Sequence, residues 1–333
     1  MRSGLEPAGA PGRLWLDLIR LRRRVWIPIG ALLLVGLVAL GLSSDDLALL
    51  DSLGVIFMYV VLTQAWNVLG GYGGYMNFGM AAFFGVGAYT TAVIGHDWSV
   101  SPVLATAAAG LASGLFALVV GIPTLRLRGA YFAIATLIVT FAVELVALNA
   151  PFTQGSLGIY LKVLPLSPLQ TEQLFYFVFL GLMLAATAIV FLIERSHFGW
   201  ALVAVREDEN AAEVLGVRTT RVKILALVLG AVMAGIVGGI YSYRVLYIEP
   251  AGTFTIDTSL NVVLMAVLGG AGFWQGPLIG APVIMAVGDV LRVAVANEVN
   301  RLIFGVVLVA VALFAPNGVM GFLRGVRGRR FTI

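Results

Sequence analysis

The sequence predicts an all-α polytopic integral membrane protein with eight to ten transmembrane helices. Of its 333 residues, 60% are hydrophobic, only 11% are charged and 40 are glycine. An ordinary soluble domain carries about 25% charged residues. Because polar backbone groups find no water inside a bilayer, apolar runs of roughly 17 to 25 residues must form helices there.

The apolar runs give the domain organisation. Ten stretches are long enough or nearly long enough to span: 26–42, 50–69, 76–95, 102–122, 130–149, 173–193, 223–245, 259–273, 277–293 and 301–316. Several are short or broken by glycine, which is why the expected count starts at eight. We treat 26–316 as one transmembrane domain between a basic N-terminal segment, 1–25, and a basic tail, 317–333. The first stretch also follows an arginine run as a signal peptide does, but an uncleaved first helix satisfies the same pattern.

The positions of the cationic residues predict the orientation. They precede the first stretch, lie in the fourth and sixth connections and follow the last stretch: Arg13, Arg20, Arg22, Arg23, Arg24, Arg126, Arg128, Arg195 to Lys223, Arg324, Arg327, Arg329 and Arg330. With ten spans these groups all fall on one side, which the positive-inside rule makes cytoplasmic, together with both termini and the 194–222 loop. The net charge of +4 indicates contact with anionic lipid headgroups and not with nucleic acid.

Metal and thiol chemistry are not expected. The chain has no cysteine, so disulfides, thiol catalysis and thiolate metal sites are excluded. Its two histidines, His96 and His197, are far apart in sequence, which argues against a histidine metal site. No catalytic residues are predicted, because His, Asp, Glu and Ser do not cluster at catalytic spacing.

Two segments of the chain resemble each other. VLGGYG at 68–73 and VLGGAG at 267–272 are followed by similar glycine-punctuated apolar runs. Paired glycine-interrupted segments are typical of transporters built from internal repeats with broken helices near the pathway. An offset of six spans would give parallel rather than inverted repeats, so either the span count differs or one glycine-rich piece, such as Gly70 to Gly74, is re-entrant. The alternative is that the small residues only let helices pack closely.

The loop at 194–222 has the features of a docking surface. Asp208 is expected to cap a short helix whose first turn holds Glu209 and Asn210, where carboxylates are favourable. Gly216 is expected to end that helix. Two turns are too short to be stable alone in water and must be held by packing. The alternative is a solvated loop without a partner.

The residues of this loop carry a resemblance to a known family. Gly199, Arg206, Glu207, Asp208, Glu209, Ala211, Ala212 and Gly216 occur in an order that resembles the EAA-type coupling loop of ATP-binding-cassette importer permeases. The loop is most similar to that of the M-type permease of branched-chain amino acid systems. Three further blocks also resemble that family: LTQAWNVLGGYGGYMNFGMAAFFGVGAYTTA, GIPTLRLRGAYFAIATL and VVLMAVLGGAGFWQGPLIGAPV. Permeases for urea, short amides and other amino acids share these blocks.

The resemblance implies a set of partners and a location. We expect a second homologous permease subunit, two ATP-binding-cassette ATPase subunits and an extracytoplasmic substrate-binding protein, in a bacterial cytoplasmic membrane. The loop residues between Gly199 and Gly216 that carry the resemblance would couple this chain to the ATPases. The chain has no GxxxxGK[ST] run, so ATP and Mg²⁺ are expected to be used by the partners, and no cofactor by this chain.

Polar and aromatic groups inside apolar runs are candidates for the translocation pathway. The candidates are Gln64, Asn67, Asn77, Phe78, Phe83, Glu144 and Asn261, with Thr136, Thr140 and Asp289 as further polar groups in such runs. Asn67 and Asn77 flank the first glycine-rich block, but hydrogen bonding between helices explains buried asparagine equally well. For Glu144 a structural role is favoured. Phenylalanines at the spacing of Phe78 and Phe83 more often only pack against neighbouring helices.

The main alternative class is an ion-coupled secondary transporter, which needs no cytoplasmic motor. Such carriers usually place ionisable residues near the midplane of several helices, and these are scarce here. A membrane enzyme or a purely structural subunit has less support from the sequence.

Overall fold

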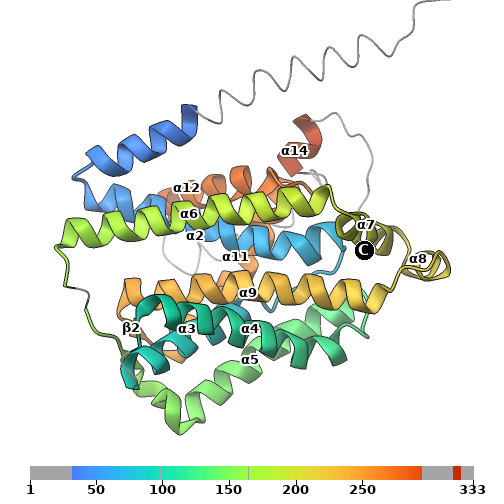
Figure 1. The fold of residues 1–333 in the computed structure, drawn as a ribbon, viewed down its shortest axis with the longest axis horizontal. Coiled ribbons are helices and arrows are strands. Elements are labelled where there is room, and N and C mark those ends of the chain that lie inside the picture. The colour runs from blue at the N-terminus through green and yellow to red at the C-terminus, as the bar shows by residue number, and fades with distance from the viewer. Residues whose placement is uncertain (1–31, 98–99, 164, 295–317, 324–333) are drawn as a thin grey trace, which may run out of the picture.

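The computed structural model describes residues 32–97, 100–163, 165–294 and 318–323, with backbone only at 97, 289–294 and 322–323. Its long helices are Leu47–Trp66 (α2), Met80–Asp97 (α3), Pro102–Thr124 (α4), Ala130–Asn149 (α5), Pro168–Glu194 (α6), Thr219–Val245 (α9), Ile256–Gly269 (α11) and Gly276–Ala294 (α12). The short ones are Asn67–Tyr72 (η1), Pro151–Thr153 (η2), Gly155–Leu157 (η3), His197–Glu207 (α7), Glu209–Val214 (α8), Pro250–Thr253 (α10) and Gly318–Leu323 (α14). Figure 1 shows most of the long helices running along the long axis of the molecule.

The helices confirm the prediction of an all-α polytopic membrane protein. In the described part of the chain, six helices are long and apolar enough to cross a bilayer, and three shorter apolar helices cover Leu32–Ser43, Met80–His96 and Gly276–Gly288. The expected span at 301–316 and the start of 26–42 lie outside the described residues, so the total of eight to ten stays a prediction.

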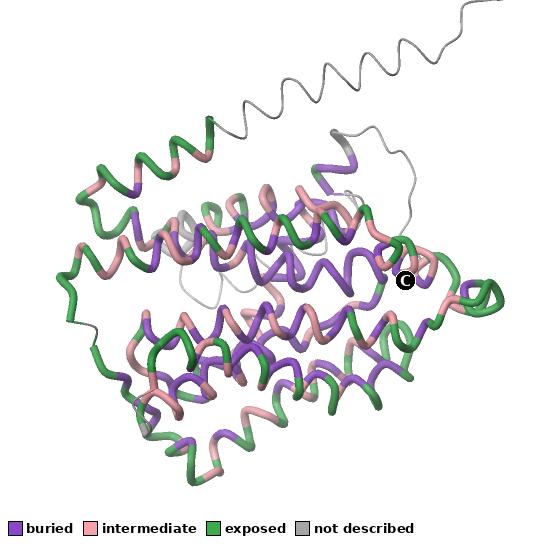
Figure 2. The backbone as a smooth tube through the Cα atoms, viewed as in Figure 1, coloured by how far each residue is buried: buried purple, intermediate pink, exposed green. Residues whose placement is uncertain are grey.

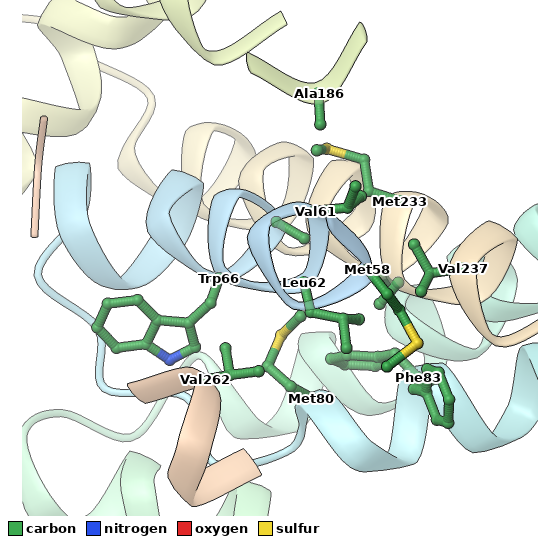
Figure 3. Close-up of a cluster of buried hydrophobic side chains, with 14 of the residues drawn as sticks. Met58, Val61, Leu62, Trp66, Met80, Phe83, Ala186, Met233, Val237 and Val262 are labelled. Atoms are coloured by element: carbon green, nitrogen blue, oxygen red, sulfur yellow. The ribbon is translucent and has the colours of Figure 1, made fainter. Parts of the chain in front are cut away.

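Helix α2 is the central helix of the bundle. It is apolar on nearly all faces, as expected for a helix that is surrounded by others, and its second half is buried. Figure 2 shows this buried interior, and Figure 3 shows side chains of α2 lying toward those of its neighbours. The labelled residues are Met58, Val61, Leu62 and Trp66 of α2, Met80 and Phe83 of α3, Ala186 of α6, Met233 and Val237 of α9, and Val262 of α11.

Helices α3, α4 and α9 pack against one another as a second group. Glycines make the contact between α3 and α9 close: a Cβ atom on Gly238 would lie 2.0 Å from the carbonyl oxygen of Phe84, and one on Gly87 would lie 2.2 Å from that of Gly235. Small residues let membrane helices approach to backbone contact in this way. The three helices therefore form a tightly packed unit.

Of the four cationic groups, only the two connections lie within the described residues; Arg13 to Arg24 and Arg324 to Arg330 lie outside them. The cationic connections between α4 and α5 and between α6 and α9 lie at the same end, where Arg128 contacts Glu209. The opposite end holds an ion pair between Asp51 and Arg244 and a two-stranded antiparallel ribbon, Ile159–Tyr160 (β1) with Tyr247–Ile248 (β2). We call the first the coupling end.

The two glycine-rich blocks lie next to each other near the coupling end. The helix pair α2–η1 and the helix α11 both run toward the coupling end, and each is followed by a non-helical break; the internal repeat itself stays a prediction. The expected span 259–273 was placed too far along the chain, because α11 begins at Ile256 and ends at Gly269, and Gly270 and Gly272 have φ angles of 114° and 80°. These left-handed angles cannot continue a helix. The expected span 76–95 begins only at Met80.

Candidate functional site

The segment 194–222 forms two short helices, α7 and α8, at the coupling end (Figure 1). The Ser196 hydroxyl caps α7 by accepting a hydrogen bond from the Gly199 amide at 3.2 Å. A Cβ atom on Gly199 would lie 2.0 Å from the Ile193 carbonyl oxygen, so the tight turn from α6 into α7 requires glycine. Leu202 and Val205 bury the inner face of α7. The helix is therefore packed onto the end of the bundle.

Helix α8 has the predicted caps. The Asp208 carboxylate accepts hydrogen bonds from the amides of Asn210 and Ala211 at 2.9 and 3.0 Å. Gly216 follows the helix with a φ angle of 88°, and its amide donates to the Glu213 carbonyl oxygen at 2.9 Å. Both ends of this two-turn helix are thus satisfied locally.

The faces of α8 differ in exposure. Val214 at the end of α8 and Leu215 directly after it are 88% and 83% exposed. Ala211 of α8 and Glu207 at the end of α7 are also exposed. Ala212, in contrast, is buried. The adjacent alanines Ala211 and Ala212 therefore lie on different sides, one toward solvent and one toward the protein.

Glu209 points into the protein, where its carboxylate has three partners. Lys223 Nζ lies 2.5 Å from Oε1, the Tyr75 hydroxyl donates to Oε2 at 2.7 Å, and Arg128 Nε lies 3.3 Å from Oε2. Lys223 is only 4% exposed and also donates to the Leu125 carbonyl oxygen at 3.2 Å. We call Glu209, Lys223, Tyr75 and Arg128 the Glu209 cluster. It connects α8 to α9, to the first glycine-rich break, to the end of α4 and to the start of α5.

The electrostatics of the Glu209 cluster favour a charged pair. Burial alone would raise the pKa of Glu209, but hydrogen bonds from Lys223 and Tyr75 and the nearby cations lower it overall. Burial, together with the hydrogen bond to Glu209, raises the pKa of Tyr75 well above its usual range. The tyrosine therefore stays a hydrogen-bond donor and the glutamate an acceptor at neutral pH.

Arg206 connects α7 to the first glycine-rich block. Its Nη1 donates to the Gly71 carbonyl oxygen at 3.0 Å, and its Nη2 lies 3.2 Å from Oε1 of Glu207. The aliphatic part of the side chain lies against Gly74, where a Cβ atom would come within 2.5 Å of Arg206 Cγ. Arg206 therefore contacts the bundle rather than extending into solvent.

The two glycine-rich blocks are bonded to each other. The Asn67 side chain accepts from the Gly272 amide at 2.8 Å and donates to the Phe273 carbonyl oxygen at 3.1 Å. Gln64 donates to the Trp274 carbonyl oxygen at 2.8 Å. These bonds join segments about 200 residues apart, one from each half of the chain.

Glu194, at the end of α6, also bonds to both glycine-rich blocks. Its Oε2 accepts from the Tyr72 hydroxyl at 2.7 Å and from the Trp274 amide at 3.4 Å. Tyr72 belongs to the first block and Trp274 to the second break. The sequence did not single out Glu194, Tyr75 or Lys223, because nothing in a linear pattern reveals which loop charges turn inward.

The pathway candidates lie in several environments. Gln64, Asn67, Asn77 and Phe83 are buried, and Phe78, Glu144 and Asn261 are half-buried; the side chain of Asp289 lies outside the described residues. Asn77 accepts from the Gly79 amide at 2.8 Å and so orders the chain before α3. Their roles in a pathway stay predictions. Within the described residues, no group of three or more His, Cys, Asp or Glu side chains could hold a metal ion.

The chain is similar to known transport permeases. The family described as branched-chain amino acid transport system / permease component matches residues 48–312. The high-affinity branched-chain amino acid transport system permease protein LivM of Salmonella typhimurium is 28% identical over 301 residues, which are 82% of this chain and 70% of that protein. A probable LivM permease of Methanocaldococcus jannaschii is 23% identical, over 79% of this chain and 90% of its own length.

A second type of relative matches a shorter region. The LivH permease protein of the Salmonella typhimurium system is 33% identical over 139 residues, covering 41% of this chain and 44% of LivH. No solved structure gave a significant match.

Proposed function

Since this chain belongs to the permease family of branched-chain amino acid transport systems, we propose that it is the M-type permease of an ATP-binding-cassette importer for branched-chain or related amino acids. The chain is a multi-pass protein of the cytoplasmic membrane and a transport subunit rather than an enzyme. In the proposed importer an extracytoplasmic binding protein delivers the amino acid, and two ATPase subunits bind at the coupling end and hydrolyse ATP. A second, homologous permease completes the passage.

One observation carries this proposal: α8 is exposed at its tip and fixed at its base. Val214 and Leu215 project from the bundle, and large exposed apolar side chains are typical of binding surfaces. The Glu209 cluster ties the base of the same helix to α4, α5 and α9. A force applied to the tip would therefore be passed to long helices instead of being lost by bending a flexible loop.

The relatives support the second permease. LivM and LivH are both named as permease proteins of one type of transport system, and this chain is similar to both. A homologous LivH-type chain is therefore the partner that we expect.

The docking surface can be tested by co-purification. We expect the double variant Val214→Glu and Leu215→Glu to lose the ATPase subunits in detergent, because two carboxylates would enter an apolar contact. A matched control places the same change on exposed apolar residues at the opposite end, Leu157→Glu and Val163→Glu, which should leave the ATPases bound. If the tip variant retains them as the control does, α8 is not the docking surface.

The lever role has a separate test. Gly216→Pro cannot adopt the φ angle of 88° and removes the amide that bonds to Glu213. We expect this variant, and Glu207→Gln on the exposed side, to lose uptake and substrate-stimulated ATPase activity while the bundle stays folded. Wild-type uptake by Gly216→Pro would contradict the lever assignment.

A further inference from the structure

We propose that Arg206 is a positioning residue that carries movement of α7 to both glycine-rich breaks at once. The inference rests on the proposed function, since it assumes that ATPase subunits move the segment 194–222. It assigns Arg206 a partner inside this chain, in addition to any contact with the ATPases.

Arg206 lies in a slot whose walls are glycine from both halves of the chain. Its Nη1 bonds to the Gly71 carbonyl oxygen, and its stem lies against Gly74. From the other half, a Cβ atom on Gly272 would lie 3.0 Å from the same Nη1. Gly74 and Gly272 have φ angles of 76° and 80°, which side-chain-bearing residues rarely adopt. Backbone conformation and space therefore both require glycine where the arginine lies.

The two breaks are expected to move together, because η1, which leads into the first break, is bonded to the second. Asn67 holds the Gly272 amide and the Phe273 carbonyl oxygen with one side chain. A Cβ atom on Gly71 would come within 2.5 Å of the Gly272 nitrogen, so the two backbones are nearly in contact. A shift of the Arg206 guanidinium thus reaches both breaks without a flexible intermediate.

Arg206 is suited to transmit such a shift. Its guanidinium stays charged at all relevant pH values and holds its donors in a rigid fork, and only 18% of the side chain is exposed. It is two residues before Asp208, which caps α8. The breaks are the points where α2 and α11 stop being regular helices, and hinges are commonly such element-terminal residues.

The absence of native cysteine makes a direct test possible. We would introduce Phe273→Cys alone, which keeps the carbonyl oxygen that Asn67 binds, and measure its maleimide labelling rate in the assembled complex. The rate is compared between the nucleotide-free state and the state held by a non-hydrolysable ATP analogue. In the parent we expect a change of about fivefold or more, the lower range of typical coupling between sites.

Four variants in this background decide the role of Arg206. Arg206→Met should reduce the nucleotide-dependent change to near onefold, whereas Arg206→Lys, which keeps a charged donor, should retain most of it. Gly272→Ala crowds the guanidinium from the other side and should act like Arg206→Met, which covers the case that the methionine variant does not assemble. Arg126→Met, an exposed arginine at the same end, is the control and should behave as the parent.

The outcomes separate this inference from the proposed function. If Arg206→Met or Gly272→Ala keeps the same nucleotide-dependent change as Arg126→Met, the positioning role is wrong although the importer assignment stands. If the parent complex binds the ATPases but its labelling rate does not change with nucleotide, the inference is likewise wrong; if it binds no ATPase, the proposed function itself fails.

Discussion

Lys223 provides the sharpest test of how the coupling element, helices α7 and α8, is attached to the bundle. Its ammonium is buried at the start of α9, 2.5 Å from Glu209 and within hydrogen-bond distance of the Tyr75 hydroxyl and the Leu125 carbonyl oxygen. Lys223→Met keeps a long apolar stem but removes the charge. The Glu209 carboxylate then stays largely buried with fewer partners.

The cost follows from the geometry. Removing one partner of a buried ion pair typically costs about 3–5 kcal/mol, because the remaining charge is left without compensation. We expect the lower end, about 3 kcal/mol, since Arg128 still pairs with Glu209 and the carboxylate side chain is 11% exposed. Replacing both members, Lys223→Met with Glu209→Leu, should cost less than the sum of the single changes by about 2 kcal/mol or more.

The measurement is the free energy of unfolding in detergent, by denaturant titration of the four members of this double-mutant cycle. Arg128→Met is the matched control, because Arg128 is 59% exposed in its side chain and an exposed pair contributes about 1 kcal/mol or less. Costs of Lys223→Met and Glu209→Leu that add within about 0.5 kcal/mol would refute the buried-pair interpretation.

Three further predictions concern single positions. Asp208→Ala should destabilise α8 by about 1 kcal/mol through loss of its cap, seen as faster amide exchange in that helix alone. Gly238→Ala forces a Cβ atom to within 2.0 Å of the Phe84 carbonyl oxygen and should cost about 1–3 kcal/mol in thermal unfolding, whereas Gly181→Ala, with nothing within 4 Å, should not destabilise. The folded pKa of Glu209 lies below its ordinary value of 4.5, so the ionised carboxylate stabilises the folded protein above that pH, and this stabilisation is lost as the pH falls below it. In thermal unfolding measured against pH, Glu209→Gln should lack this loss of stability.

Local chemistry made α8 predictable. Asp208 and Gly216 act through their own backbone neighbours, so their spacing alone indicates where the helix begins and ends. Long apolar runs likewise predicted the spans, because the bilayer leaves helix as the main option. The orientation of Glu209 was not predictable, since it depends on Tyr75, which is distant in sequence, and on how the start of α9 turns Lys223 inward.

Asn67 illustrates a different limit. The sequence allowed either a pathway residue or a hydrogen-bonding asparagine, and both fit a polar group in an apolar run. The structure shows that its amide binds the Gly272 and Phe273 backbone. Only the packing of two segments from opposite halves of the chain brings those partners together, and no local pattern contains that information.

The coupling element holds one dipeptide from two sides. Arg206 of α7 lies against Gly74, and Glu209 of α8 accepts the hydrogen bond of the next residue, Tyr75. Residues that share a partner segment usually show coupled energies, whereas independent sites add. The variants Arg206→Met and Glu209→Gln should therefore be non-additive by about 0.5 kcal/mol or more in unfolding. Additive costs would mean that α7 and α8 hold the first break independently, and that neither helix senses the other through it.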